Sequence, residues 1–271
     1  MHRFYISPER WNPDHLALTG GEAHHARDVL RLKAGDRVVL FNGKGREVTA
    51  ELSDASSNEL RFQKLTETET RPLNCRITLG QAIPKGKNMD LIVQKAVEIG
   101  VADICPLMSQ RTVVDLDPAA AAQKKSKWQQ VAIEAAKQCG QNWLPTVQTP
   151  RTLKDFFSSS VAAVYPSRGS QAEADDRRAE PAGSGAFDLR LIGSLQPDAQ
   201  HLKAILSQYS IDHGRSPRSV LMMVGPEGDF TPAELSLAKS QGCLPITLGP
   251  IILRVETAAI YCLSVLSYEL F

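Results

Sequence analysis

Two glycine-proline pairs near the end of the chain carry the residue types best suited to chemistry. Gly225-Pro226 and Gly249-Pro250 each follow a short apolar run that is typical of a buried strand. Glycine lets a flat ligand approach the backbone closely, and proline stiffens the loop. The charged residues that follow soon after these pairs are Glu227, Asp229, Arg254 and Glu256. We therefore expect the two loops to lie side by side and to form a ligand site.

The carboxylates bear on which ligand suits such a site. The chain contains neither GxGxxG nor GxxxxGKS/T, the motifs that hold phosphates. Glu227 and Asp229 would repel a pyrophosphate. A ligand with an adenine ring and a positive centre fits better, and S-adenosylmethionine carries both a sulfonium and an amine. The alternative at this point is that the loops are two purely structural turns.

A capped helix is expected directly after the first loop. Thr231 is a good N-cap, Pro232 suits the first helical position, and Glu234 completes a capping box in a helix expected to end at Gly242. Residues 225–230 then connect a strand to a helix. In a parallel sheet such a connection lies at the carboxyl edge, where open α/β folds bind ligands.

The region that contains both loops alternates between strands and helices, which predicts an α/β fold with a parallel sheet. The expected strands are residues 76–83, 102–108, 187–195, 219–224 and 244–248. The expected helices are residues 87–100, 124–140 and 231–242, with a last helix after 251–260. Residues 166–185 contain no bulky apolar side chain, and we expect them to form a mobile surface insertion.

The N-terminal part of the chain is expected to be mainly β structure. Residues 36–52 alternate in polarity around Asn42-Gly43, which predicts a hairpin because both residues tolerate positive φ. A further strand is expected at 58–65 and a short helix at 21–32, ended near Gly35. Short strands around one short helix suggest a small β-barrel. We place the boundary near residue 72, which gives domains of residues 1–72 and 73–271.

Composition is that of a soluble globular protein. Of 271 residues 42% are hydrophobic and 23% are charged, and no apolar run approaches the roughly 18 residues that span a bilayer. The polar N-terminus does not resemble a secretory signal, so we expect a cytoplasmic protein. The five cysteines have no close pairs and His24-His25 has no third ligand nearby, so we expect neither disulfides nor a bound metal.

Charge is segregated along the chain. Residues 24–46 carry a net charge of +4 and residues 219–271 carry −3, whereas the whole chain is nearly neutral at +1. This pattern suits a protein that binds a polyanion with its N-terminal part and a cationic or neutral small molecule with its C-terminal part. An uneven surface without functional meaning is the alternative.

Longer stretches around these residues are similar to one known family. VGPEGDFTPAE, at 224–234, and LGPIILRVETAA, at 248–259, resemble the paired signatures of the SPOUT methyltransferases. Within that group they resemble most the RsmE family of ribosomal RNA uridine methyltransferases. The resemblance extends to IPKGKNMDLIVQKAVEIGV, EAAKQCGQNWLP, RFYI and HHARDVLRLKAGD. It therefore covers nearly the whole chain outside residues 166–185.

The resemblance implies a fold and an activity. The fold is a PUA-like β-barrel for RNA binding, followed by an α/β SPOUT domain tied in a deep trefoil knot. The family also implies a homodimer, S-adenosylmethionine in the knot, and small-subunit ribosomal RNA or the assembled subunit as partner, without a membrane or a metal. The implied enzyme is a 16S rRNA (uracil-N3)-methyltransferase that forms 3-methyluridine.

Four positions depart from the family pattern. Ile251 and Gln141 stand where arginine is common, Asp229 replaces a frequent glycine, and Val255 replaces a frequent threonine. The loss of two positive charges weakens the expected contact with RNA at those points. The residues that are retained are the loop glycines, Glu227, Arg254, Glu256 and Thr257.

The implied reaction suggests roles for the charged residues. The uridine nitrogen between two carbonyls is a poor nucleophile until its proton leaves, so the enzyme must stabilise negative charge on the base. Arg254 is the expected catalytic cation, because arginine can donate to a uracil carbonyl without losing its charge. Glu256 is the second candidate, as a base or as the partner that orients Arg254. The alternative for Arg254 is a structural ion pair with Glu227 or Glu256.

The other expected site residues form two groups. Those expected to contact the cofactor are Leu195, Gln196, Gly225, Glu227, Gly228, Leu248, Gly249, Ile252 and Leu253. Those expected to contact RNA are Arg3, Arg27, Arg31, Lys33, Lys85, Lys87 and Arg111. The last three follow expected strands, where a cationic side chain or a helix N-terminus can hold phosphate. For each RNA residue a solvated surface charge is the alternative.

Two other functions stay open from the sequence. The first is a non-catalytic RNA-binding protein, which the two lost arginines favour and the glycines retained in both loops disfavour. The second is an α/β enzyme that uses another nucleotide, which the missing phosphate loop disfavours.

Overall fold

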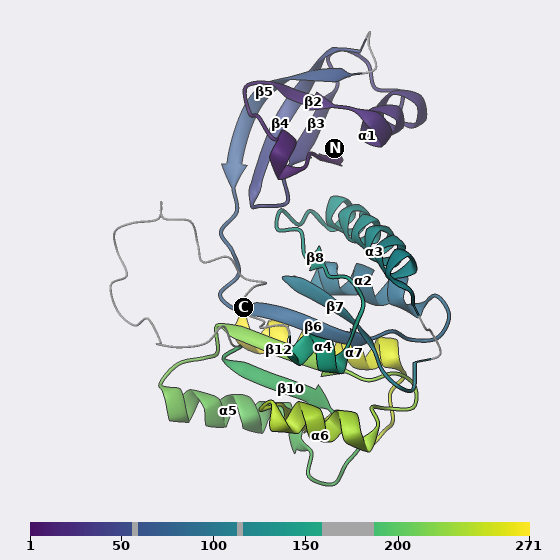
Figure 1. Cartoon of the computed structure of the whole chain (residues 1–271). Coiled ribbons are helices and arrows are strands. Elements are labelled where there is room, and N and C mark those ends of the chain that lie inside the picture. Colours follow the sequence, from purple (N-terminus) through teal and green to yellow (C-terminus); the bar gives the residue numbers. More distant parts are fainter. Residues whose placement is uncertain (56–58, 113–115, 159–186) are drawn as a thin grey trace.

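The chain forms two units, each built on its own sheet (Figure 1). The computed structural model describes residues 1–55, 59–112, 116–158 and 187–271. The predicted mobile insertion at 166–185 lies outside these described residues. The last strand of the first sheet ends at Glu69 and the first strand of the second sheet begins at Arg76.

The N-terminal unit is a curled sheet, with five strands among its described residues in the order β1-β3-β4-β5-β2. These are β1 (His2–Tyr5), β2 (Leu16–Leu18), β3 (Arg37–Phe41), β4 (Arg46–Asp54) and β5 (Leu60–Glu69). β1 pairs in parallel with β3, and the other pairs are antiparallel. Two register shifts in β4, at 49/50 and between 52 and 54, bend the strand as β-bulges do.

A short helical segment connects β2 to β3. It consists of α1 (Gly20–His24) and a π-helical turn (His25–Val29), and a 3₁₀ turn (Pro8–Arg10) precedes β2. Ala23 and Ala26 from this segment are buried against the curled sheet. The helix predicted over 21–32 is thus confirmed, with its end at Val29.

The predicted hairpin is confirmed, but its turn is wider than Asn42-Gly43. β3 and β4 are antiparallel, with Phe41 opposite Glu47. Oδ1 of Asn42 accepts hydrogen bonds from the backbone N–H groups of Lys44 at 2.8 Å and Arg46 at 3.1 Å. The Asn42 side chain therefore closes the turn.

The C-terminal unit is an α/β fold, and its sheet has eight strands within the described ranges, all paired in parallel. The order is β11-β13-β10-β12-β6-β7-β8, and β9 also pairs with β7. The strands are β6 (Arg76–Ala82), β7 (Asp103–Met108), β8 (Thr146–Val147), β9 (Arg151–Thr152), β10 (Leu189–Gly193), β11 (Gln200–His201), β12 (Ser219–Val224) and β13 (Leu244–Thr247). The five predicted strands are confirmed, with ends shifted by a residue or two.

Helices cover both faces of this sheet. They are α2 (Asn88–Ile99), α3 (Pro118–Cys139), α4 (Leu153–Ser158), α5 (Leu202–His213), α6 (Pro232–Ser240) and α7 (Val255–Leu270). On one face α2, α3, α5 and α7 form the core with the sheet, and on the other face α4 and α6 do so. Strands covered on both sides are apolar at successive positions, which explains the continuous run in β12.

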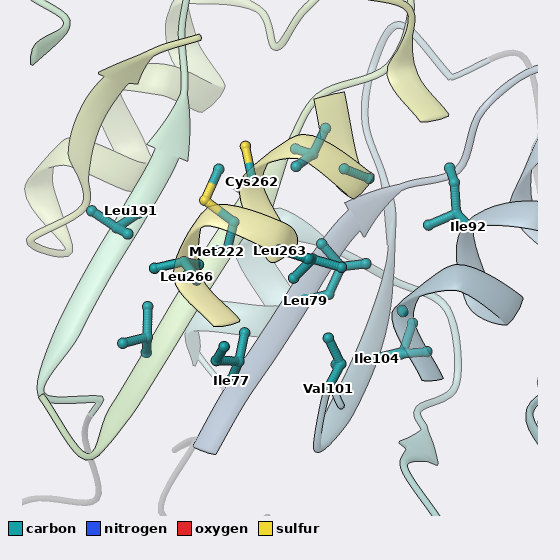
Figure 2. Close-up of a cluster of buried hydrophobic side chains, with 14 of the residues drawn as sticks. Ile77, Leu79, Ile92, Val101, Ile104, Leu191, Met222, Cys262, Leu263 and Leu266 are labelled. Carbon is teal, nitrogen blue, oxygen red and sulfur yellow. The ribbon is translucent and has the colours of Figure 1, made fainter. Parts of the chain in front are cut away.

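The larger core shows how the strands hold α7. Leu79 of β6 and Met222 of β12 lie against Cys262, Leu263 and Leu266 of that helix (Figure 2). All five side chains are fully or almost fully buried. This packing fixes the start of α7 at the edge of the sheet where the two glycine-proline loops lie.

The predicted ends of the helices have clear physical causes. Thr231 and Glu234 form the complete capping box at the start of α6. Gly100 and Gly140 follow α2 and α3 with φ values of 95° and 80°, a backbone conformation that favours glycine. α3 begins earlier than predicted, because Asp117 caps it by accepting a hydrogen bond from the Ala120 N–H at 2.7 Å.

Candidate functional site

A cavity of about 490 Å³ lies at the carboxyl edge of the parallel sheet. Three strand ends line it, through residues within 193–195 after β10, 224–229 after β12 and 248–256 after β13. Asn88 at the start of α2 and Ala258 of α7 complete the lining. The site is thus built at the place where parallel α/β sheets bind ligands.

The two glycine-proline loops converge on this cavity, as predicted, although their strands are not neighbours. β10 lies between β12 and β13 and pairs with both. Two strand spacings amount to roughly 10 Å, which leaves room for a flat ring between the loops. Residues 193–195 after β10 line the same cavity.

Most residues predicted to contact a cofactor line the cavity. The lining includes Leu195, Gly225, Glu227, Leu248, Gly249, Ile252 and Leu253. Gln196 and Gly228 lie outside it: the Gln196 N–H donates to Ser194 Oγ at 3.1 Å, and the Gly228 carbonyl accepts from Arg111 Nη1. The prediction that these two contact the cofactor therefore lacks support from their positions.

The sequence prediction missed three lining residues in particular. Gly193 and Ser194 come directly before Leu195, so the rule that found Leu195 at a strand end would also have found them. Asn88 carries no such local signal. The fold brings it to the cavity because α2 follows β6, which is the neighbour of β12 in the sheet.

Gly225 and Gly249 are required for different reasons. A Cβ atom on Gly225 would lie 3.1 Å from Asp229 Oδ1 and 3.2 Å from the Phe230 nitrogen. A Cβ on Gly249 would meet no atom within 4 Å, but this residue has a φ of 109° that other residues rarely adopt. Gly225 therefore permits a tight loop, and Gly249 permits a backbone conformation that a side chain would strain.

The loop after β12 and the start of α6 are anchored to the connections that follow β6 and β7. Glu227 Oε1 accepts a hydrogen bond from the Lys85 N–H at 2.9 Å, which joins it to the β6–α2 loop. Buried Glu234 of α6 accepts from Ser109 Oγ at 3.0 Å and from the Gln110 N–H at 2.9 Å, which joins the start of α6 to the connection after β7. These contacts hold the loop in place beside the cavity.

Asp229 occupies a backbone conformation that explains its departure from the family pattern. Its φ is 63°, in the left-handed region where glycine is favoured and aspartate is tolerated. Its Oδ1 also accepts a hydrogen bond from the Phe230 N–H at 2.7 Å. Aspartate can therefore replace glycine here without changing the course of the loop.

Arg254 and Glu256 both line the cavity at the start of α7. Arg254 is exposed, and within the described part of the chain its side chain makes no hydrogen bond or ion pair. The alternative of an ion pair with Glu227 or Glu256 is therefore not found. Glu256 Oε2 accepts a long hydrogen bond from Asn88 Nδ2 at 3.3 Å, which joins the start of α7 to the start of α2.

The residues predicted to contact RNA fall in two places. Lys85, Lys87 and Arg111 are exposed on the connections around the cavity, since Lys87 precedes Asn88 and Arg111 reaches Gly228. Arg31 and Lys33 are exposed in the N-terminal unit, and Arg27 pairs with Asp28, whose hydrogen bond raises the pKa of the arginine.

Arg3 is placed differently from the other predicted RNA contacts. Its side chain is only 14% exposed and pairs with Glu47 Oε2 at 2.8 Å. Its second nitrogen donates to Asn142 Oδ1 at 2.6 Å. These internal partners occupy the guanidinium and leave little of it for a phosphate.

The described ranges contain neither a metal-binding cluster nor a helix that could span a membrane. No group of three His, Cys, Asp or Glu side chains there could hold a metal ion. His24 Nδ1 pairs instead with Asp28 Oδ2 at 2.6 Å. No described helix has the length and apolar character needed to cross a membrane.

Two family models and several known proteins match the chain. The model of the RNA methyltransferase domain matches residues 71–267, and that of the RNA methyltransferase PUA domain matches residues 18–65. Ribosomal RNA small subunit methyltransferase E of Bacillus subtilis is 30% identical over 280 residues, which cover 99% of this chain and 97% of the relative. The Synechocystis protein of the same name is 29% identical, over 97% of this chain and 76% of the relative.

Solved structures show the same similarity. Ribosomal RNA small subunit methyltransferase E from Neisseria gonorrhoeae, bound to S-adenosyl methionine, is 29% identical with a TM-score of 0.77, covering 99% of this chain and 98% of that one. A Legionella pneumophila methyltransferase in complex with the same cofactor is 30% identical with a TM-score of 0.78, covering 98% and 97%.

Proposed function

The chain belongs to the RNA methyltransferase family, and on that premise we propose that it methylates N3 of a uridine in 16S ribosomal RNA with S-adenosylmethionine as donor. Methylation of ribosomal RNA with this cofactor is supported by relatives that share its whole length. The choice of uracil N3 is the finer part of the proposal and comes from the resemblance of the loops 224–234 and 248–259.

The residues of the cavity fit this cofactor. The charged side chains that line it are Glu227, Asp229, Arg254 and Glu256, so carboxylates outnumber the one cation. That balance suits a ligand with a positive sulfur and an amine and disfavours a pyrophosphate. When bound, S-adenosylmethionine supplies a methyl group on a positively charged sulfur. We propose that Glu227 holds the positive part and that the backbone at Gly225 and Gly249 holds the adenine.

Arg254 is proposed to stabilise the base during the reaction. Because its guanidinium has no partner among the described residues, it is free to donate to a uracil carbonyl oxygen. Loss of the N3 proton places negative charge on that oxygen, and a fixed cation stabilises it more than it stabilises the neutral base. Glu256 lies two residues on, where its carboxylate can accept the proton or orient Arg254.

Lys85, Lys87 and Arg111 are proposed to hold RNA backbone beside the cavity. All three are exposed, and they come from the connections after β6 and β7, both of which contact the loop after β12. Phosphate contacts of this kind set the position of an RNA without reading its sequence. The N-terminal unit, which the PUA model matches, is called the PUA unit. Its residues Arg27, Arg31 and Lys33 are proposed to extend this contact.

Several wider properties of the family belong to the same proposal. They are a barrel-like N-terminal domain at residues 1–72, a deep trefoil knot in residues 73–271, a homodimer and a cytoplasmic location. The break between the two sheets, from Glu69 to Arg76, supports the proposed boundary.

The convergence of both glycine-proline loops on one cavity carries this proposal. A non-catalytic RNA-binding protein is not favoured, because such a protein would need neither an open cavity nor glycines that line it. Calorimetric titration with S-adenosylmethionine and mass mapping of 16S rRNA incubated with enzyme and cofactor test the two steps. If the cofactor produces no heat of binding and no rise in the melting temperature, the proposal is overturned. A methyl group on another base would overturn the N3 assignment.

A further inference from the structure

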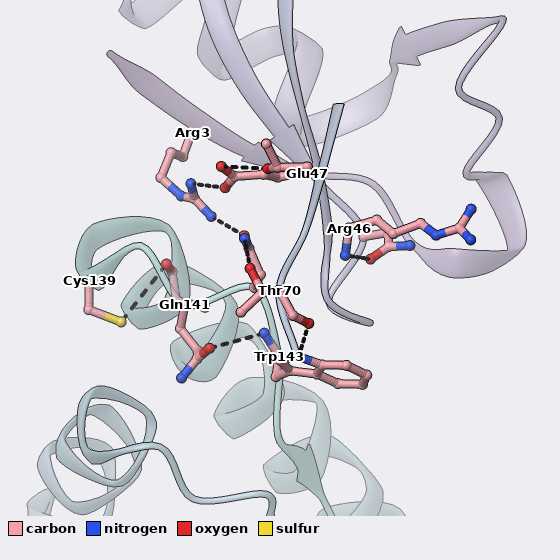
Figure 3. Close-up of polar contacts among 11 residues, drawn as sticks. Arg3, Arg46, Glu47, Thr70, Cys139, Gln141 and Trp143 are labelled. Carbon is pink, nitrogen blue, oxygen red and sulfur yellow. Dashed lines mark hydrogen bonds and ion pairs between the residues drawn. The ribbon is translucent and has the colours of Figure 1, made fainter. Parts of the chain in front are cut away.

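The segment between α3 and β8 belongs to the C-terminal unit and makes hydrogen bonds to the N-terminal unit. It lies against the tip of the β3–β4 hairpin and against Thr70, the residue after β5 (Figure 3). The Gly45 N–H donates to the Asn142 carbonyl at 3.0 Å, and the Leu144 N–H donates to the Gly43 carbonyl at 3.1 Å. Lys44 and Trp143 thereby form an antiparallel bridge from one unit to the other.

The Asn142 side chain is at the centre of this contact. It is only 5% exposed, and its amide uses both ends. Oδ1 accepts from Arg3 Nη2 at 2.6 Å, and Nδ2 donates to Thr70 Oγ1 at 2.9 Å. The same residue thus contacts β1 and the end of β5, two segments that are far apart in the sequence.

The neighbours of Asn142 strengthen the contact. Trp143 Nε1 donates to the Thr70 carbonyl at 2.9 Å. Gln141 Oε1 accepts from the Trp143 N–H at 3.2 Å, so the residue that replaces a common arginine here shapes the segment. Lys137 of α3, 11% exposed, adds an ion pair with Glu22 at 3.1 Å.

The fit at the hairpin tip leaves no free space. A Cβ atom on Gly43 would lie 2.9 Å from Leu144 Cβ. A Cβ on Gly45 would lie 2.7 Å from the Trp143 ring and 2.8 Å from the Thr70 carbonyl oxygen. Domains in one chain usually move relative to each other unless their interface prevents it. Directional hydrogen bonds and close backbone packing oppose such motion here.

We propose that residues 142–144 form an interdomain clamp that fixes the orientation of the PUA unit, and that Asn142 is a positioning residue for RNA methylation. This inference rests on the proposed function, because it assumes that RNA contacts both units. The clamp lies apart from the cavity: residues 142–144 precede β8, whose first residue pairs with Asp103 at the start of β7. The clamp is therefore at the amino edge of the sheet and the cavity is at the carboxyl edge.

The position of the clamp separates its effect on RNA from any effect on the cofactor. The Asn142→Ala variant removes both side-chain hydrogen bonds, while the backbone bond to Gly45 remains. We expect it to bind S-adenosylmethionine as the wild type does. We expect kcat on 16S rRNA to fall by about tenfold or more with a smaller change in KM, because a small misplacement of the target base slows reaction while phosphate contacts persist.

Three matched variants sharpen the test. Asn142→Asp keeps an acceptor for Arg3 and should recover part of the rate, and Thr70→Val removes only the Thr70 hydroxyl bond and should show a milder loss. Asn12→Ala, at an exposed asparagine of the N-terminal unit whose Oδ1 accepts a local hydrogen bond from the Asp14 N–H, should behave as the wild type. Among these four variants, only Asn142→Ala should show a wider distribution of shapes than the wild type in small-angle scattering.

Two results would overturn the inference. One is wild-type kcat in Asn142→Ala and Thr70→Val. The other is a parallel loss of cofactor affinity and rate in both, which would mean that the segment only supports the fold. If the wild-type protein does not methylate RNA at all, the proposed function fails, and the scattering comparison alone decides whether the clamp holds the units: identical curves would reject it.

Discussion

Glu227 Oε1 accepts a hydrogen bond from the backbone N–H of Lys85 at 2.9 Å, across 142 positions of sequence. This bond joins the loop after β12 to the loop after β6 at the edge of the sheet where the cavity lies. A predicted cofactor residue and a predicted RNA residue therefore contact each other directly. One carboxylate has two tasks: it fixes the neighbouring loop and it brings negative charge to the cavity.

The two tasks of Glu227 can be separated by substitution. Glu227→Gln keeps an acceptor for the Lys85 N–H but removes the charge, whereas Glu227→Ala removes both. We expect both variants to lose affinity for S-adenosylmethionine, by about tenfold or more, since hydrogen bonds to charged groups contribute about 1.5–3 kcal/mol. Calorimetric titration measures this, with Glu269→Ala as a control at an exposed glutamate outside the cavity lining. Wild-type affinity in Glu227→Gln would show that only the loop contact matters.

Arg254 should matter more for the reaction than for binding. We expect Arg254→Ala to lower kcat by roughly a hundred- to a thousand-fold, the usual effect of removing one group that stabilises developing charge, and to change cofactor affinity little. Single-turnover methylation of 16S rRNA and calorimetry measure the two quantities. Arg37→Ala, an exposed arginine of the PUA unit, serves as the control. An equal loss of rate and of cofactor affinity would mean that Arg254 only supports the structure of the loops.

Gly249 offers a test of the cavity wall with a closely matched control. Gly249 and Gly214 both have positive φ, 109° and 67°, and a Cβ on either would meet no atom within 4 Å. Both alanine variants should therefore lose similar stability, about 1–2 kcal/mol, from backbone strain. Only Gly249→Ala should weaken binding of S-adenosylmethionine, because Gly249 alone of the two lines the cavity. Equal affinities in both variants would remove Gly249 from the proposed site.

Asp188 should make the stability of the fold depend on pH. Burial alone would raise the pKa of this carboxyl, but hydrogen bonds from Arg215 and the Arg218 N–H outweigh it and lower the pKa below its usual value. Its contribution to the free energy of unfolding is therefore present at pH 7 and is lost as the pH falls through the lowered pKa. Asp188→Asn should cost about 1 kcal/mol at pH 7 in urea unfolding, since the pair is partly exposed.

The free energies of unfolding at low pH provide the control for this prediction. The difference between the wild type and Asp188→Asn should shrink below about pH 4, where the carboxyl of the unfolded chain is protonated. Asp198→Asn, in the exposed ion pair with Lys239, should have a smaller effect at every pH. A difference that stays constant down to pH 2 would contradict the electrostatic cause.

The cysteines should differ sharply in reactivity. Burial raises the pKa of Cys75, Cys105, Cys243 and Cys262 to about 12, whereas Cys139 is exposed. A disulfide reagent such as Ellman's should therefore label only Cys139 in the native protein at pH 8, and all five thiols after denaturation. Cys139→Ser should abolish native labelling. Rapid reaction of a second native thiol would show that part of the core opens readily.

Local patterns were sufficient for much of the fold. The capping box at Thr231 and Glu234, the strand 219–224 and the glycine after α2 all depend on residues within a few positions of each other. The two loops could be identified as a ligand site for the same reason. The missed start of α3 shows the limit, because its cap at Asp117 lies before a run of alanines that gives no apolar face.

The placement of residues from distant segments could not be read in this way. The charge of Arg3 predicts a contact with RNA, but the partners of its side chain, Glu47 and Asn142, lie 44 and 139 positions away. Asn88 reaches the cavity only because β6 is next to β12, and β10 separates the two loops only because of the order of the sheet.

Most helices and strands, the capping box of α6 and the two glycine-proline loops follow from the sequence, because helix and strand periods and turn residues act over short distances. Contacts between distant segments set which loops share a cavity, which arginine lines it and how the two units are joined. Strand order and docking depend on packing between segments that are far apart along the chain, and no local pattern records such packing.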